Sequence, residues 1–141
     1  MTAKRYFLDT NIIVYSFDAQ NPDKQQRARQ LIHDALTQNC GCISYQVVQE
    51  FCNVATRKFA TPMSEQDCRE YLAQVLMPLC EVYPGSEFYR QALVIQERWK
   101  YSFYDSLIIN AANLAGCQIL YSEDLQHGQQ ILGTSIQNPF A

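Results

Sequence analysis

The sequence predicts a single α/β domain in which a short parallel sheet lies between helices on both of its faces. The chain has 141 residues, near the usual size of one domain, and its 48% hydrophobic residues are enough for a buried core. Charged residues make up only 18%, which excludes a disordered chain. Short apolar runs alternate with segments that carry helix start and stop signals, and this pattern indicates parallel strands joined by helices.

The first half of the chain contains two predicted strands and two predicted helices. Residues 6–8 are apolar and form the first short strand. A helix is predicted over residues 22–38, because proline is favoured at the first helical position. Residues 42–44 form the second strand. Ser44 is then expected to cap a helix over residues 45–58.

From Ser64 onward the sequence predicts three helices and three strands. Ser64 has Asp67 three residues after it, and Ser102 precedes an apolar run, so both serines are expected to cap helices. In chain order the predicted elements are a helix after Ser64, a weak strand over residues 81–83, a helix from the Pro84-Gly85 turn to about Lys100, a helix from Ser102 to Gly116, a strand over residues 118–121 and a last strand over residues 134–136.

Charge and hydropathy limit the partners and the compartment. The formal net charge is −3, so there is no bulk attraction to nucleic acid, and a polyanionic partner needs local basic residues or metal ions. The apolar run near the N-terminus is too short for a signal peptide, and no stretch is long enough to span a membrane. These features predict a soluble, cytoplasmic protein.

The six cysteines are expected to pack in the core. They contain no Cys-x-x-Cys pair, and the two histidines lie far from them in the sequence. A domain of this size with so many apolar residues needs no disulfide framework. A thiol in apolar surroundings acts as a small hydrophobic group.

Four acidic residues stand at the ends of apolar strands or on helices that would pack against the sheet: Asp9, Glu50, Asp105 and Asp124. Carboxylates near a hydrophobic core are costly unless something compensates their charge. Four of them together would repel one another, and a divalent cation is the natural partner. Asp9 and Asp124 follow predicted strands, and ligands bind beyond the carboxyl ends of such strands. A metal site is therefore predicted there.

Each acid also has an alternative structural role. Asp9 could open a turn or cap a following helix. Asp105 could belong to a capping box with Ser102, three residues earlier. Glu50 could be a solvated helix residue, and Asp124 a loop residue. Each structural role can account for one acid by itself. Four separate structural roles explain the whole set less well than one shared metal site does.

The acids lie in four short motifs that are, in chain order, Phe7-Leu8-Asp9-Thr10-Asn11, Ser44 with Val48-Gln49-Glu50-Phe51, Tyr104-Asp105-Ser106-Leu107-Ile108, and Ser122-Glu123-Asp124-Leu125 with His127-Gly128. Their order and spacing resemble the motifs of PIN-domain ribonucleases, most closely the VapC-type toxins of toxin–antitoxin pairs. The resemblance implies one PIN-like nuclease domain over residues 1–141, with the four acids as its catalytic quartet. Tyr104 and Ser106 stand where that family often has Trp and Ala, a departure that bears on substrate preference.

The ligand chemistry predicts the metal. Carboxylates without His or Cys favour Mg²⁺ or Mn²⁺ over zinc. Such an ion can activate and position a water for attack and neutralise charge on a phosphate. We expect Asp9, Glu50 and Asp105 to hold one ion, directly or through water. Asp124 would complete the cluster or help to bind a second ion. Three polar residues are expected to orient the carboxylates or waters: Thr10, Asn11 and Ser122.

Basic and aromatic residues are candidates for RNA contact. Arg57 is seven residues after Glu50, almost on the same helix face, and is the best candidate for a phosphate contact. Lys58 is rotated from it by about a quarter turn. Solvated surface charge is the alternative for both. Five aromatic residues could stack on unpaired bases or pack in the core: Tyr15, Phe17, Tyr101, Phe103 and Tyr104.

The predicted function is metal-dependent hydrolysis of RNA phosphodiester bonds by the toxin of a type II toxin–antitoxin pair. The resemblance also implies a homodimer and an antitoxin segment that covers the acidic cleft. A stand-alone RNA-processing nuclease and a PIN module that binds RNA or a partner without cutting remain alternatives. A phosphatase is disfavoured, because Asn11 stands where an Asp-x-Asp motif has its second acid and no glycine-rich phosphate loop occurs.

Overall fold

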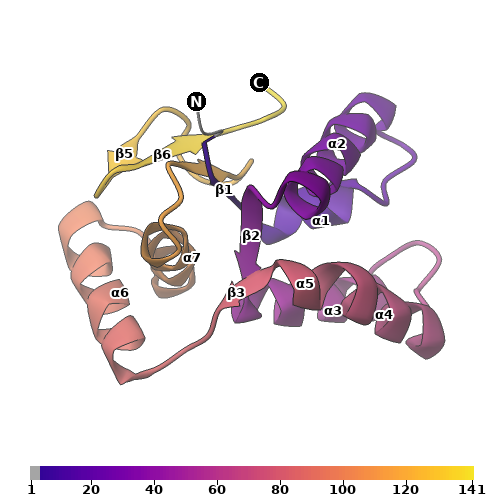
Figure 1. The fold of residues 1–141 in the computed structure, drawn as a ribbon, viewed down its shortest axis with the longest axis horizontal. Coiled ribbons are helices and arrows are strands. Elements are labelled where there is room, and N and C mark those ends of the chain that lie inside the picture. Colours follow the sequence, from indigo (N-terminus) through magenta and orange to yellow (C-terminus); the bar gives the residue numbers. More distant parts are fainter. Residues whose placement is uncertain (1–3) are drawn as a thin grey trace.

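A six-stranded sheet forms the centre of the computed structural model, which describes residues 4–141 (Figure 1). The strands are β1 (Tyr6–Leu8), β2 (Gly41–Ser44), β3 (Cys80–Val82), β4 (Ile119–Tyr121), β5 (Gln130–Ile131) and β6 (Thr134–Gln137). Their order across the sheet is β3-β2-β1-β4-β6-β5. All neighbouring strands are parallel except β5 and β6, so the predicted parallel sheet is confirmed apart from this edge hairpin.

Helices cover both faces of the sheet, as predicted. They are α1 (Thr10–Tyr15), α2 (Pro22–Gln38), α3 (Tyr45–Arg57), α4 (Glu65–Tyr71), the π-helical segment η1 (Leu72–Leu76), α5 (Met77–Leu79), α6 (Ser86–Trp99) and α7 (Phe103–Leu114). Figure 1 shows α6 and α7 on one side of the sheet and α1, α2 and α3 on the other. The helix α7 contacts β2 and β4, whereas α2 and α3 contact β2.

The core is built around β1 and α7. Phe7 and Leu8 have no exposed surface, and β1 is paired with β2 on one side and β4 on the other. On α7, residues 106–112 are all buried. A helix that is apolar on all sides belongs in the interior of a domain, which explains why α7 lies between the sheet and α6.

The predicted elements are all present, with ends that differ by one or two residues. The hydroxyls of Ser64 and Ser102 accept hydrogen bonds from the backbone N–H groups of Asp67 and Asp105, so both caps are confirmed. The prediction that the Ser44 side chain caps α3 is wrong. This residue stands at the N-cap position of α3, but it is also the last residue of β2, and its buried hydroxyl has no partner among the described residues.

No helix is among the elements predicted for residues 10–15, although capping of a following helix was the alternative role given for Asp9. Ile12, Ile13 and Val14 are β-branched, and such residues are poor helix formers. The structure stabilises α1 by other means. Asp9 is its N-cap and accepts a hydrogen bond from Thr10 N–H, while Ile12 and Ile13 are fully buried. Tertiary packing therefore outweighs the local preference.

The strand β5 was also missed. It has two residues and pairs with β6 through a two-residue turn formed by Leu132 and Gly133. Both turn residues have positive φ, 51° and 90°, as tight hairpin turns require. The usual sequence signal for such a turn is Asn-Gly or Asp-Gly, and leucine at the first position hides it.

All six cysteines are free thiols, and four of them, Cys40, Cys42, Cys80 and Cys117, are buried. The other two, Cys52 and Cys68, are half-buried. This agrees with the predicted packing role. Within residues 4–141, no helix is long and apolar enough to cross a membrane.

The strand order reverses at β1, and this point positions the site. From β1 the chain proceeds outward to β2 and β3, then returns to place β4 on the opposite side of β1. A crevice is expected beyond the carboxyl ends of β1 and β4, because their connections leave in opposite directions. Asp9 directly follows β1, and Ser122 directly follows β4.

Candidate active site

A pocket of about 390 Å³ opens at this point and brings all four predicted acids together. Asp9 comes from the end of β1, Glu50 from α3, Asp105 from the first turn of α7, and Asp124 from the loop after β4. The full lining is Asp9, Thr10, Asn11, Gln46, Glu50, Asn53, Val54, Lys58, Tyr104, Asp105, Ile108 and Asp124. The predicted convergence of residues that are far apart in the sequence is therefore present in the fold.

Asp9 is the buried member of the four. Its carboxylate accepts hydrogen bonds from Thr10 N–H and from the Ser122 hydroxyl, each at 2.7 Å. The pKa of Asp9 is raised to about 6, chiefly by burial. The two hydrogen bonds lower this pKa, and the charges of Glu50 and Asp124 add to the increase. The hydrogen bonds do not fully compensate the cost of burying the charged carboxylate. A bound cation would stabilise this charged form.

Two of the predicted supporting residues hold Glu50 and Asp124. The Thr10 hydroxyl donates to Glu50 Oε1 at 2.7 Å. The Asn11 amide donates to Asp124 Oδ2 at 3.0 Å. Because Thr10 and Asn11 are the first residues of α1, this short helix links the acid of β1 to the acids of α3 and of the β4 loop.

Ser122 orders the loop that carries Asp124. Its hydroxyl donates to Asp9 and accepts from the Asp124 backbone N–H at 3.2 Å. The next residue, Glu123, points elsewhere: it accepts from the Tyr15 hydroxyl and forms an ion pair with Lys24, each at 2.6 Å. The loop is thus held from both sides, and Asp124 is left directed at the pocket.

Asp105 has the least protein support. Its backbone N–H donates to Ser102 Oγ, so one half of the capping alternative is present. Its carboxylate, however, makes no hydrogen bond or ion pair with the described residues. A half-buried carboxylate on the wall of this pocket is available to an external ligand.

The donor set suits a hard divalent cation. None of the four carboxylates forms an ion pair within residues 4–141, although they share one pocket. No three His, Cys, Asp or Glu side chains in that part of the chain are already close enough to enclose an ion. Mg²⁺ is commonly bound by one or two carboxylates and keeps several waters, so acids spread around a pocket of this size fit such an ion.

The basic residue that lines the pocket is Lys58, whereas Arg57 does not line it. Arg57 ends α3, about 10 Å along the helix axis from Glu50. Lys58 is the C-cap of α3, four residues after the lining residue Val54 and therefore on the same side of the helix. The proposed role of Arg57 in RNA binding stays a prediction.

Three other residues of the lining were not predicted as site residues: Gln46, Asn53 and Val54. They lie four residues before and three and four residues after Glu50, on the same face of α3. Extending the helical period from Glu50 would have identified them. Gln46 is buried, and its amide donates to the Tyr104 carbonyl at 3.4 Å, which connects α3 to the start of α7.

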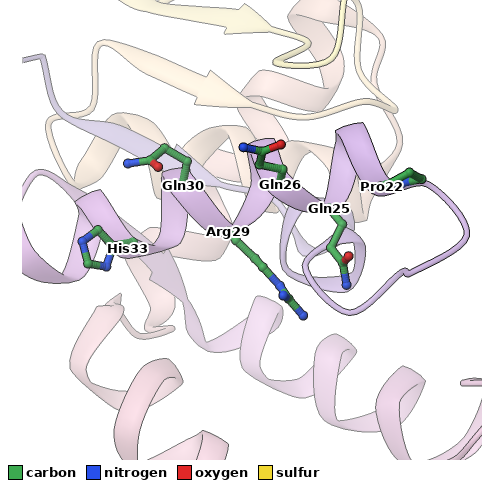
Figure 2. A pocket seen from close by; sticks show the side chains of 6 residues that line it. All are labelled: Pro22, Gln25, Gln26, Arg29, Gln30 and His33. Carbon is green, nitrogen blue, oxygen red and sulfur yellow. The ribbon is translucent and has the colours of Figure 1, made fainter.

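A second hollow, of about 320 Å³, lies along one face of α2 (Figure 2). It is lined by Pro22, Gln25, Gln26, Arg29, Gln30 and His33. All of these residues come from one helix, and none carries a carboxylate. The acidic pocket is therefore the better candidate for the active site.

Comparison with known proteins agrees with this architecture. The family model described as PIN domain matches residues 6–129. No curated protein matches the sequence.

Solved structures resemble the chain over nearly its whole length. A toxin–antitoxin complex from Klebsiella pneumoniae superposes with a TM-score of 0.67 at 18% identity, covering 95% of this chain and 97% of the other. DNA-bound VapBC from Salmonella typhimurium gives 0.65 at 19%, covering 97% and 99%. VapC20 of Mycobacterium tuberculosis, a sarcin-ricin loop cleaving toxin, gives 0.61 at 21%, covering 84% and 89%. At these identities the likeness establishes the fold.

Proposed function

This chain belongs to the PIN domain family, and from that premise we propose that it is a metal-dependent endoribonuclease, the toxin of a type II toxin–antitoxin pair. The observation that carries the proposal is the pocket at the carboxyl ends of β1 and β4, which gathers four carboxylates from four different parts of the chain. We also propose that one domain spans residues 1–141 and that the protein acts in the cytoplasm.

The four carboxylates are the proposed metal ligands, with Asp9, Glu50 and Asp105 holding one ion and Asp124 completing the site or binding a second. Mg²⁺ or Mn²⁺ suits oxygen ligands of this kind. The bound ion would lower the pKa of a water ligand and neutralise charge on the scissile phosphate.

The protein's own part in the reaction is to fix and orient these charges. Thr10 and Asn11 hold Glu50 and Asp124 by hydrogen bonds, and Ser122 holds Asp9. Fixed ligands need little rearrangement when the substrate arrives, which lowers the barrier to reaction. Loss of a supporting residue of this kind typically lowers metal affinity or activity by roughly 10–100-fold.

The partner is proposed to be an antitoxin protein, with the toxin itself a homodimer. Solved structures that share this fold include toxin–antitoxin complexes. A small gene beside this one, encoding a protein with a DNA-binding half and an apolar tail, would support the toxin assignment over a stand-alone processing nuclease. Light scattering of the purified protein at high concentration tests the dimer, and a persistent monomer would contradict it.

The direct test of the proposed activity is cleavage of RNA by the purified chain, freed of any partner, in Mg²⁺ or Mn²⁺ and in EDTA. Cleavage that requires the metal supports the nuclease. A protein that binds RNA without cutting it in either ion is instead a binding module.

Phosphate contacts near the pocket give a further prediction. Arg57→Ala is expected to weaken RNA binding and to reduce the slope of log K against log salt concentration by about 0.7, because one phosphate contact is lost. Lys58→Ala is the matched comparison, since both residues are exposed at the end of α3 and only Lys58 lines the pocket. An unchanged slope for Arg57→Ala, with a reduced slope for Lys58→Ala, would transfer the phosphate contact to Lys58.

A further inference from the structure

Tyr104 is an exposed aromatic residue on the wall of the acidic pocket. It stands one position before Asp105 in the first turn of α7, and 66% of its surface is exposed. No other residue with an aromatic ring is part of the described lining of the pocket. A large ring left in water beside a candidate active site is a feature that packing of the core does not explain.

The backbone of Tyr104 is held by a hydrogen bond, whereas most of its ring is exposed to solvent. The carbonyl of Tyr104 accepts a hydrogen bond from the buried Gln46, and the ring touches Phe103 edge-on at 5.7 Å between centroids. Its hydroxyl has no hydrogen-bond partner among the described residues. The ring is therefore positioned by the fold and keeps an open face.

Other aromatic residues that could have contacted RNA are already engaged. The Tyr15 hydroxyl donates to Glu123, and its ring packs on Phe140. Phe17 packs against Phe51 and other rings of one cluster. The Tyr101 hydroxyl donates to Gln129, and Phe103 is half-buried against the core. Of the five candidates, Tyr104 is the one that lines the pocket.

Electrostatics explain why such a ring is useful here. The chain carries a net charge of −3, and four carboxylates and one lysine line the pocket. A phosphate backbone gains little from that field before metal binds. Stacking of a base on an aromatic ring does not depend on charge and is tolerant of sequence.

We propose that Tyr104 stacks on an unpaired base next to the phosphate held at the four carboxylates and so positions the RNA in the pocket. The inference rests on the proposed nuclease function. A base inside a duplex is stacked on both of its faces and has none to offer the ring.

The test compares steady-state cleavage of a short single-stranded RNA by Tyr104→Ala, Tyr104→Phe and wild-type protein in Mg²⁺. Tyr104→Ala is expected to raise KM about tenfold with kcat little changed, because the stacking contact holds both substrate and transition state. Tyr104→Phe keeps the ring and should behave as wild type.

Tyr83→Ala is the matched control, because Tyr83 is also exposed, at 58%, and lies outside the pocket. A 2-aminopurine base beside the cleavage site gives a second readout, measured in the Asp105→Asn background so that the RNA stays intact. Its fluorescence should be quenched on binding when Tyr or Phe is at position 104, and not when Ala is there.

If the wild type cleaves RNA and Tyr104→Ala has the same KM, the stacking role is wrong, whereas the proposed nuclease activity is supported. The ring would then be assigned to contact with a protein partner. A loss confined to kcat would also overturn the stacking role. Absence of any cleavage by wild type in Mg²⁺ or Mn²⁺ would remove the nuclease and the stacking role together.

Discussion

Asp105→Asn is expected to abolish most RNA cleavage, by at least about a hundredfold, while the fold remains intact. The substitution keeps the size of the side chain and removes only its charge. The Asp105 carboxylate makes no contact with the described residues that the change would break, and its backbone N–H still donates to Ser102. Initial cleavage rates measure the effect, and circular dichroism with a melting curve confirms the fold.

Asp67→Asn is a close control for this experiment. Asp67 stands in the same relation to Ser64 as Asp105 does to Ser102, with backbone N–H to serine Oγ distances of 3.1 Å in both caps. Asp67 is exposed on α4, outside the pocket, so its replacement should leave cleavage unchanged. EDTA should inhibit the wild type, and Mg²⁺ or Mn²⁺ should restore it. Cleavage that persists in EDTA would contradict the metal mechanism.

The second large effect is expected in the pH dependence of stability in metal-free buffer. Burial raises the pKa of Asp9 from 3.8 to about 6, so the folded state binds this proton more tightly than the unfolded state does. Protonation of Asp9 therefore stabilises the folded state. This stabilisation is fully present below pH 4 and is lost as the pH rises through about 6. Asp9 should therefore lower the free energy of unfolding by roughly 2–3 kcal/mol between pH 4 and pH 7.

Asp9→Asn should remove this fall, which corresponds to roughly 5–10 °C in melting temperature for a domain of this size. The quantity to compare is the change with pH, because asparagine also disturbs the hydrogen bonds from Ser122 and Thr10 and alters the absolute stability. Melting curves of both proteins in EDTA across this range measure it. Parallel curves for wild type and variant would show that Asp9 does not titrate in this window.

Asp124→Asn separates metal binding from burial. Asp124 is exposed, so this variant should keep most of the pH dependence of the wild type. If Asp124 helps to hold the ion, saturating Mg²⁺ should stabilise the wild type more than the variant, by up to about 2.7 kcal/mol when the metal is at a hundred times its dissociation constant. Equal stabilisation of the two proteins would exclude Asp124 from the metal site.

The sequence alone determined most of the elements and the location of the site. The apolar run before Asp9, the start signals at Pro22, Ser64 and Ser102 and the apolar stretch of α7 are local patterns. Local patterns identify a strand or helix because one segment's own periodicity and capping decide it. The rule that ligands bind at the carboxyl ends of parallel strands then placed Asp9 and Asp124 together.

The tertiary structure alone decided how the site is held. Thr10 and Glu50 are 40 residues apart, and Asn11 and Asp124 are 113 apart, yet each pair forms a hydrogen bond. The sequence contains the residues but not these pairings. They depend on α1, a helix of β-branched residues that is stable only because Asp9 caps it and the core buries it.

Packing between elements also explains two other differences between prediction and structure, the basic residue at the pocket and the burial of the four acids. Spacing from Glu50 alone favoured Arg57, but the pocket extends along the side of α3 that carries Val54 and Lys58. Composition treats the four acids alike, but the fold buries Asp9 and leaves Glu50 and Asp124 exposed. Spacing along a chain determines which face of its own helix or strand a residue occupies. Burial and distance between elements depend on how those elements pack against one another, and packing is set by the whole core at once.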